Sequence, residues 1–143
     1  MDFTLEAAMD AAPVAVLAEV ADLPGYPAWH GMVHRVEPDG NGWLVDLGGR
    51  VGPFTKTKRV RLRRHEGEAA GRVRFVRAEQ DGRDHSPWEL EAVVEPAAGE
   101  GPCTLRFRLF YGGSSPLVGM LEPVLRAEVE QAAERLRGRL AHD

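Results

Sequence analysis

The spacing of apolar and polar residues changes along the chain and separates it into three parts. Residues 2–9 alternate between apolar and polar side chains, which is typical of a half-buried strand. From Pro13, which suits the first position of a helix, apolar residues recur at helical spacing. The prolines and glycines of residues 23–31 then exclude a long helix. We therefore expect a second short helix around Tyr26–His30.

Residues 32–111 consist of short alternating runs separated by turn sequences rich in Gly, Asp, Asn and Pro. This is the pattern of an antiparallel meander built from hairpins. We predict strands at residues 32–38, 43–51, 54–65, 71–80, 87–96 and 103–111. Together with the first strand they would form a sheet of seven strands.

After residue 115 the apolar residues return to helical spacing, which continues to residue 140. Ser115 can cap this helix and Pro116 can begin it, whereas Pro123 either bends the helix or marks its true start. A helix of about 25 residues spans roughly 37 Å and can lie along the concave face of a bent sheet. The sequence thus predicts an α+β helix-grip fold: a curved seven-stranded antiparallel sheet around a long C-terminal helix, with two short helices after the first strand.

A curved sheet of this size is hard to fill with side chains from one helix. The space left over would be an apolar pocket of the kind that binds small molecules. The apolar positions expected to line it are Phe75, Trp88, Leu90, Phe107, Leu109, Met120 and Val124. Each of these residues could equally be plain core, but some of them must line any cavity.

Strand alternation also predicts a charged outer face for the sheet. If residues 96–102 turn a hairpin, Glu91 lies near Arg106 and Glu89 near Arg108. Opposite charges on neighbouring strands stabilise a sheet by roughly 0.2–1 kcal/mol per pair. Such pairs would support the predicted strand order.

The basic segment 56–64 fits this scheme less well. Its Arg61 and Arg63 would point outward beside other arginines, with no acid between them. Two interpretations stay open: a solvated basic face, or a docking patch for an acidic partner or an anionic ligand.

Overall composition narrows the classes of function. The chain has 143 residues, 43% of them hydrophobic and 28% charged, which indicates one domain spanning residues 1–143. A net charge of −4 argues against a nucleic-acid binder. Cys103 is the one cysteine, so nothing requires an oxidising compartment, and neither a signal peptide nor a membrane span is recognisable. We expect a cytoplasmic protein.

Three polar residues are the candidates for catalysis. Tyr26 offers a hydroxyl, and with Trp29 it either plugs the end of the core or forms a ligand-facing wall. Arg77 shares a strand face with apolar residues, so it either reaches out to solvent or anchors a ligand carboxylate or enolate. His34 would share its strand face with apolar neighbours, although a surface position is the default for it, as for His30 and His65.

Known catalytic and cofactor motifs give no further guidance. No nucleophile elbow, phosphate loop, metal motif or dinucleotide fingerprint is present. We therefore expect no cofactor and no metal. Any chemistry would be positioning with acid–base assistance.

Three passages of the chain resemble one superfamily. They are Ala12-Pro13-Val14 followed by Tyr26-Pro27-Ala28-Trp29, the hairpin from Trp88 to Phe107, and the helix opening at Pro116. Together with the order of elements they resemble the START-like, or SRPBCC, superfamily of the polyketide cyclase/dehydrase and lipid-transport type.

The resemblance implies a hydrophobic or aromatic ligand, polyketide- or lipid-like, held between sheet and helix. The protein would be a carrier or a cofactor-independent polyketide cyclase/aromatase-like enzyme. Two alternatives are a non-enzymatic module that docks a protein through strand 56–64, and a scaffold with a filled core that forms a homodimer.

Overall fold

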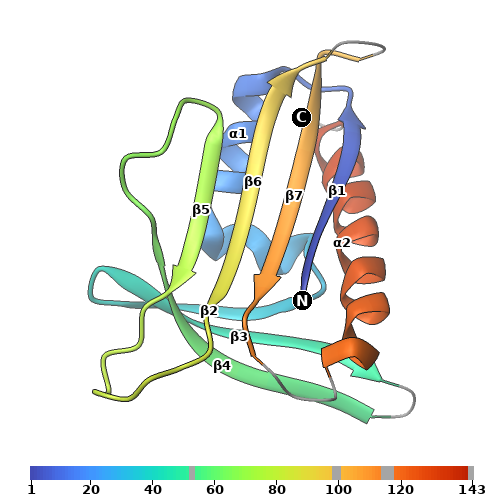
Figure 1. Cartoon of the computed structure of the whole chain (residues 1–143). Helices are drawn as coiled ribbons and strands as arrows, with labels where there is room; N and C mark the ends of the chain where they lie inside the picture. The colour runs from blue at the N-terminus through green and yellow to red at the C-terminus, as the bar shows by residue number, and fades with distance from the viewer. Residues whose placement is uncertain (52–53, 98–100, 114–117, 142–143) are drawn as a thin grey trace.

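The computed structural model describes residues 1–51, 54–97, 101–113 and 118–141, and it has the predicted helix-grip architecture (Figure 1). Side chains are described for these residues except residues 50, 51, 54–56 and 118. The elements are β1 (Asp2–Met9), α1 (Pro13–Ala21), the 3-10 helix η1 (Leu23–Ala28), β2 (Val33–Asp39), β3 (Gly42–Val51), β4 (Phe54–Arg64), β5 (Arg72–Arg77), β6 (Trp88–Pro96), β7 (Cys103–Tyr111) and α2 (Val118–Leu140).

All seven strands belong to one antiparallel sheet with the order β1-β7-β6-β5-β4-β3-β2. This order confirms the predicted meander and adds the first strand beside the last. In Figure 1 the sheet curves so that β2, β3 and β4 run across the lower ends of the other four strands. Helix α2 packs against β1 and β3, whereas α1 packs against β5 and β6. The core therefore lies between the concave face and the helices.

The alternation along β6 and β7 produces the core, as predicted. On β7, Leu105, Phe107 and Leu109 are buried, and the residues between them are not. Helix α2 supplies Leu125, Val129, Ala132 and Leu136 from one stripe at helical spacing. Further buried side chains of the interior come from α1 and η1. They are Val16, Val20, Leu23 and Tyr26, with Trp29 directly after η1.

Helix α2 begins before Pro123 and continues through it. The proposed cap and first residue, Ser115 and Pro116, lie outside the described residues. Proline removes one hydrogen bond of the helix, and Pro123 lies in the second turn with its ring exposed.

The prediction that His34 shares a strand face with Met32 and Val36 is wrong. The register between β2 and β3 shifts between Val33 and Arg35, so simple alternation fails there. Met32 and Val33 are both buried, and His34 is exposed. This bulge directs the imidazole away from the core.

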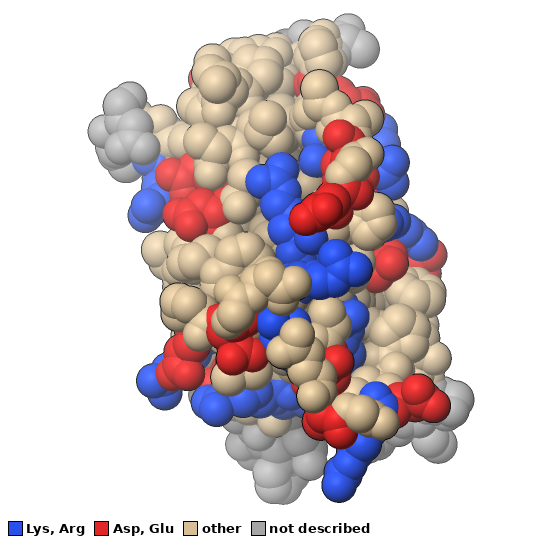
Figure 2. All heavy atoms as spheres, turned by 90° about the vertical axis from the view of Figure 1, so that its left-hand side faces the viewer, with Lys and Arg blue, Asp and Glu red and all other residues tan. Residues whose placement is uncertain are grey.

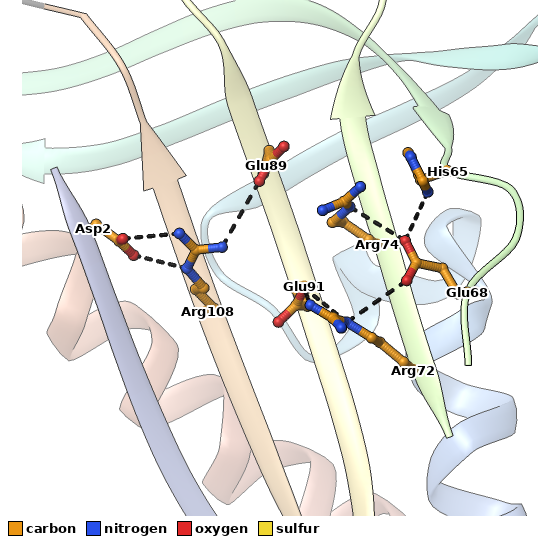
Figure 3. A network of polar contacts seen from close by, with 8 residues as sticks. All are labelled: Asp2, His65, Glu68, Arg72, Arg74, Glu89, Glu91 and Arg108. Carbon is orange, nitrogen blue, oxygen red and sulfur yellow. Dashed lines mark hydrogen bonds and ion pairs between the residues drawn. The ribbon is translucent and has the colours of Figure 1, made fainter. Parts of the chain in front are cut away.

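The outer face of the sheet carries the predicted ion pairs, with one change of register (Figure 3). Arg108 pairs with Asp2 at 2.9 Å, and it also lies 3.9 Å from Glu89, as expected. Glu91 opposes Arg108 rather than Arg106, because the hairpin pairs Pro96 with Cys103. The observed pairing of β6 with β7 differs from the predicted pairing by two residues. Because side chains alternate with a period of two, each one stays on the predicted face of the sheet.

A second group of charges covers the same face beside β5. Arg72 lies 2.6 Å from Glu91, and Glu68 of the β4–β5 loop approaches Arg72, Arg74 and His65 (Figure 3). Glu68 is largely buried by these neighbours. The contacts hold the loop against the sheet.

We expect Gly71→Ala to destabilise the fold by about 1–3 kcal/mol. Gly71 has a φ of +81°, and a Cβ there would lie 2.8 Å from the carbonyl oxygen of Val94. The matched control is Gly138→Ala on α2, where an added Cβ meets no atom within 4 Å. Alanine should stabilise that helix by about 1 kcal/mol. Urea unfolding followed by circular dichroism should move the two midpoints in opposite directions; a shift in the same direction would contradict this account.

Candidate functional site

An aromatic cluster marks the centre of the concave side. Its geometry follows from η1, where Pro24 and Pro27 restrict the backbone to a single short helix. The rings of Tyr26 and Trp29 lie 4.5 Å apart, and Trp29 stacks on Phe107 at 5.9 Å. Both Tyr26 and Trp29 are buried, so this cluster joins η1 to β7 across the core.

Tyr26 is held by the protein itself. Its hydroxyl donates a hydrogen bond of 2.7 Å to the carbonyl oxygen of Val20. Burial, assisted by the negative charge of Asp22, raises the pKa of the Tyr26 phenol far above its ordinary value. The hydroxyl proton is therefore used in the hydrogen bond to α1. The Tyr26 ring contributes only its surface to the interior.

His30 is the buried imidazole of this region, with 4% of its surface exposed. Its Nδ1 accepts a hydrogen bond of 3.3 Å from the backbone N–H of Met32. Burial, with a smaller effect of the Arg135 charge, lowers the pKa of His30 from 6.5 to about 4. The surface position expected by default for this histidine is therefore wrong. A clue in the sequence is its place directly after Trp29.

A cavity of about 20 Å³ lies beside these aromatic rings. Its lining consists of Tyr26, His30, Met32, Leu90, Glu91, Phe107, Arg108, Leu109 and Val129. Such a volume holds about one water molecule, whereas small-molecule sites usually measure about 300–1,000 Å³. The side chains from α1 and η1 occupy much of the space that a sheet and one helix would leave open.

A larger groove of about 440 Å³ opens between β1 and α2. Its lining consists of Leu5, Glu6, Ala7, Ala8, Phe107, Glu130, Ala133, Glu134 and Arg137. Phe107 lines both this groove and the small cavity, so this residue borders the two spaces. Sequence reasoning missed the β1 and α2 residues as site residues, although the alternation of residues 2–9 already placed Leu5 and Ala7 on the core face.

Two arginines of α2 attach that helix to β1 on either side of the groove. Near one end, the Arg126 guanidinium lies 4.8 Å from the centre of the Phe3 ring. At the other end, Arg137 donates two hydrogen bonds, of 3.0 and 2.8 Å, to the carbonyl oxygen of Ala8. The groove therefore lies between two fixed points of contact.

The predicted ligand-binding residues divide into three groups. Tyr26, Leu90, Phe107 and Leu109 meet at the small cavity. Trp29, Phe75 and Trp88 belong to the surrounding core, where Phe75 lies edge-on to Tyr26 at 6.0 Å and Trp88 stacks on Tyr111 at 4.7 Å. Met120 is 63% exposed, and Val124 lies near Gly49 of β3, where an added Cβ would be 3.5 Å from its side chain. The last two therefore lie apart from the cavity.

Arg77 lies at the end of β5 with 7% of its side chain exposed. Its guanidinium contacts Glu79 at 3.0 Å, the carbonyl oxygen of Ser86 at 3.1 Å and Nδ1 of His85 at 3.2 Å. These contacts use all three nitrogens of the guanidinium. Arg77 is thus neither free in solvent nor next to the small cavity, and it fastens the β5–β6 loop.

Glu79, Asp81 and His85 bring their ligand atoms within 4.8 Å of one another in that loop. Nε2 of His85 lies 2.8 Å from Asp81, whose pKa is held below its usual value by the Arg83 backbone N–H and by His85. Because Arg77 donates to the other nitrogen of His85, its positive charge disfavours a cation at this position.

The expectation that Arg61 is a solvated arginine with no acid beside it is wrong. Its side chain is 4% exposed and donates 2.8 Å hydrogen bonds to Asp39, Asn41 and the carbonyl oxygen of Ala78. Simple alternation did not show that the β2–β3 turn and the segment after β5 close over β4.

On the face drawn in Figure 2, Lys and Arg form a central band flanked by Asp and Glu.

Comparison with known proteins identifies a family that matches nearly the whole chain. A family model described as "Polyketide cyclase / dehydrase and lipid transport" matches residues 1–141. No curated protein sequence matches the chain. Among the helices formed by described residues, none is long and apolar enough to cross a membrane.

Solved structures show the same fold at low sequence identity. A START superfamily protein from Mycobacterium smegmatis has a TM-score of 0.70 and 16% identity, with 99% of this chain and 97% of that chain covered. A protein from Thermus thermophilus has a TM-score of 0.70 and 19% identity, with coverage of 99% and 98%. The Zhui aromatase/cyclase from a Streptomyces species has a TM-score of 0.64 and 16% identity, with coverage of 99% and 93%.

We expect the folded state to lose about 3 kcal/mol of stability through His30 between pH 6.5 and pH 4. The unfolded chain binds the proton near pH 6.5, and the folded chain binds it only near pH 4. The effect is absent above pH 6.5 and grows as the pH falls. Urea unfolding at a series of pH values measures it. His30→Gln should remove this part of the pH dependence, and His34→Gln, at an exposed position, should retain it; equal slopes for all three proteins would refute the assignment.

We expect Arg61→Met to destabilise the fold by about 1–3 kcal/mol, because part-buried acceptors on two other segments lose their shared donor. Arg59 supplies the control, since its ion pair with Asp46 is solvent-exposed, with 53% of the Arg59 side chain accessible. Arg59→Met should cost less than about 1 kcal/mol. Thermal unfolding of both variants measures the difference, and equal losses would contradict a structural role for Arg61.

Proposed function

The chain belongs to the polyketide cyclase / dehydrase and lipid transport family, and from this premise we propose that it binds a hydrophobic or aromatic small molecule, polyketide- or lipid-like, between the sheet and α2. The family and the fold are consistent with binding hydrophobic ligands. The observation that carries the proposal is the shared position of Phe107, which lines both the outer groove and the buried cavity.

The size of the groove supports this proposal. A volume of about 440 Å³ lies within the usual range for small-molecule sites, about 300–1,000 Å³. Its inner surface is apolar where Leu5, Ala7, Phe107 and Ala133 contribute, and its rim carries the charged residues Glu6, Glu130 and Glu134. An apolar ligand would bury its body in the groove and keep any polar end at the rim.

Phe107 provides the route inward. Its ring is 7% exposed and lies 5.9 Å from Trp29 and 6.1 Å from His30. A change of its rotamer would join the groove to the cavity, and an aromatic ligand would then replace the lost ring contacts. The ligand thus reaches the interior without displacement of α2 from β1.

The polar groups favour a carrier over an enzyme. The Tyr26 hydroxyl is bonded to Val20, and the three nitrogens of Arg77 are bonded within the β5–β6 loop. The third catalytic candidate, His34, is exposed on β2. None of these three is poised to move a proton on a molecule held at Phe107.

Native mass spectrometry of the freshly purified protein tests the proposal. We expect a non-covalent adduct of roughly a few hundred daltons that disappears on denaturation, because a molecule of that size fills the groove. The neutral dye N-phenyl-1-naphthylamine should bind to the folded protein and be displaced by the extracted ligand. A protein that carries no adduct and binds no dye would refute the proposal.

Variants at two neighbouring phenylalanines locate the site. Phe107→Trp should weaken dye binding about tenfold, because the larger ring obstructs both spaces. Phe110→Trp is the matched control, since Phe110 lies on the opposite face of the same strand. Thermal unfolding verifies that both variants fold. Equal dye affinities for the two variants would place the site away from Phe107.

A further inference from the structure

We propose that His30 selects the ligand by donating one hydrogen bond from Nε2 to a neutral acceptor atom, such as a carbonyl or ether oxygen, at the buried end of the site. This inference rests on the proposed function, since it assigns the polar contact for a molecule that passes Phe107. It makes His30 a specificity-determining residue and assigns it no catalytic step.

The hydrogen bond from Met32 determines which nitrogen of His30 carries the proton. Nδ1 is the acceptor of the Met32 backbone N–H, so in the neutral ring the proton is on Nε2. His30 lines the small cavity, and within the described part of the chain no residue accepts a hydrogen bond from its Nε2. A ligand oxygen that accepts a hydrogen bond from Nε2 in this largely apolar site would gain about 1 kcal/mol.

The other polar residues around the cavity already have partners. Tyr26 donates its hydroxyl to Val20. The charged ends of Glu91 and Arg108 pair on the outer face of the sheet, with Arg72 and Asp2 respectively (Figure 3). The remaining lining is the apolar set Met32, Leu90, Phe107, Leu109 and Val129. His30 is thus the polar group available to a ligand among the described residues that line this cavity.

A second buried donor strengthens the argument. The indole Nε1 of Trp29 is buried and has no hydrogen-bond partner among the residues that the structure describes. The Trp29 ring lies 5.6 Å from the His30 ring and stacks on Phe107. Two neighbouring aromatic residues next to Phe107 therefore have N–H groups without an acceptor in the described part of the protein.

The charges around His30 favour a neutral ligand atom. Glu128 and Arg135 of α2 both approach Gly31, the residue after His30, and the Arg135 charge acts against protonation of the imidazole. Burial keeps the ring uncharged near neutral pH, because the pKa of His30 is lowered to about 4. A carboxylate in this apolar lining would lose its hydration without gaining a cation of its own.

The test compares two probes of nearly equal shape, tetralin and 1-tetralone, which differ by one carbonyl oxygen. Their dissociation constants are measured by displacement of N-phenyl-1-naphthylamine. The measured quantity is the ratio of the dissociation constant of tetralin to that of 1-tetralone. The two probes differ in hydrophobicity by the same amount in every variant, so a change in the ratio between variants reports the contact with the carbonyl oxygen. His30→Leu should lower this ratio about tenfold relative to the parent protein. His30→Gln retains an N–H donor at a similar reach and should retain most of the ratio.

His34→Leu is the control, since it removes an exposed imidazole from β2. It should leave the ratio unchanged. A ratio that is the same in the parent protein and in His30→Leu would overturn the inference while leaving the proposed function intact. Binding of neither probe, with no dye binding to displace, would overturn both.

The tautomer can be read without any ligand. A ¹H–¹⁵N correlation spectrum of the imidazole at neutral pH should show His30 protonated at Nε2, and the Nε2 signal should shift when 1-tetralone is added. This measurement uses the unaltered protein and does not depend on the folding of variants. Protonation at Nδ1, or no shift of Nε2 at a saturating tetralone concentration, would overturn the inference.

Discussion

The packing of Tyr26 on Trp29, and of Trp29 on Phe107 of β7, is the contact on which the rest of the structure depends. These two residues fill space that a curved sheet and one helix would leave empty, and Trp29 supports the Phe107 ring. This packing reduces the inner cavity to about 20 Å³ and buries His30 beside it. The geometry of the candidate site is therefore set by a short proline-rich segment that is distant in sequence from the strand it contacts.

The two faces of the sheet are stabilised by different interactions. The concave face is apolar and packs on the helices, where burial provides the main free energy. On the outer face, exposed pairs such as Arg108 with Asp2 each contribute little, and Glu68 adds contacts that hold a loop. Arg61 differs from these pairs because it is buried and bonded to three segments. It joins the hairpin after β2 to the segment after β5, so its charge is used within the fold.

A groove and a small cavity that share one residue fit the proposed binding of an apolar molecule by a protein that retains a packed core. The groove is bounded by two arginine contacts between α2 and β1, so its width is defined without the interior being open. Movement of the one side chain at Phe107 would then suffice to connect the two spaces.

The amino-acid sequence by itself determined the strands, the helices and the meander, because periods of 2 and 3.6 residues and the positions of Pro and Gly are local properties. It also placed Leu90, Phe107 and Leu109 on the face of the sheet where the structure brings them together. Tertiary structure alone decided the rest. The burial of His30, the bulge that exposes His34 and the partners of Arg61 each depend on segments that are distant along the chain, and no local pattern records which segments meet.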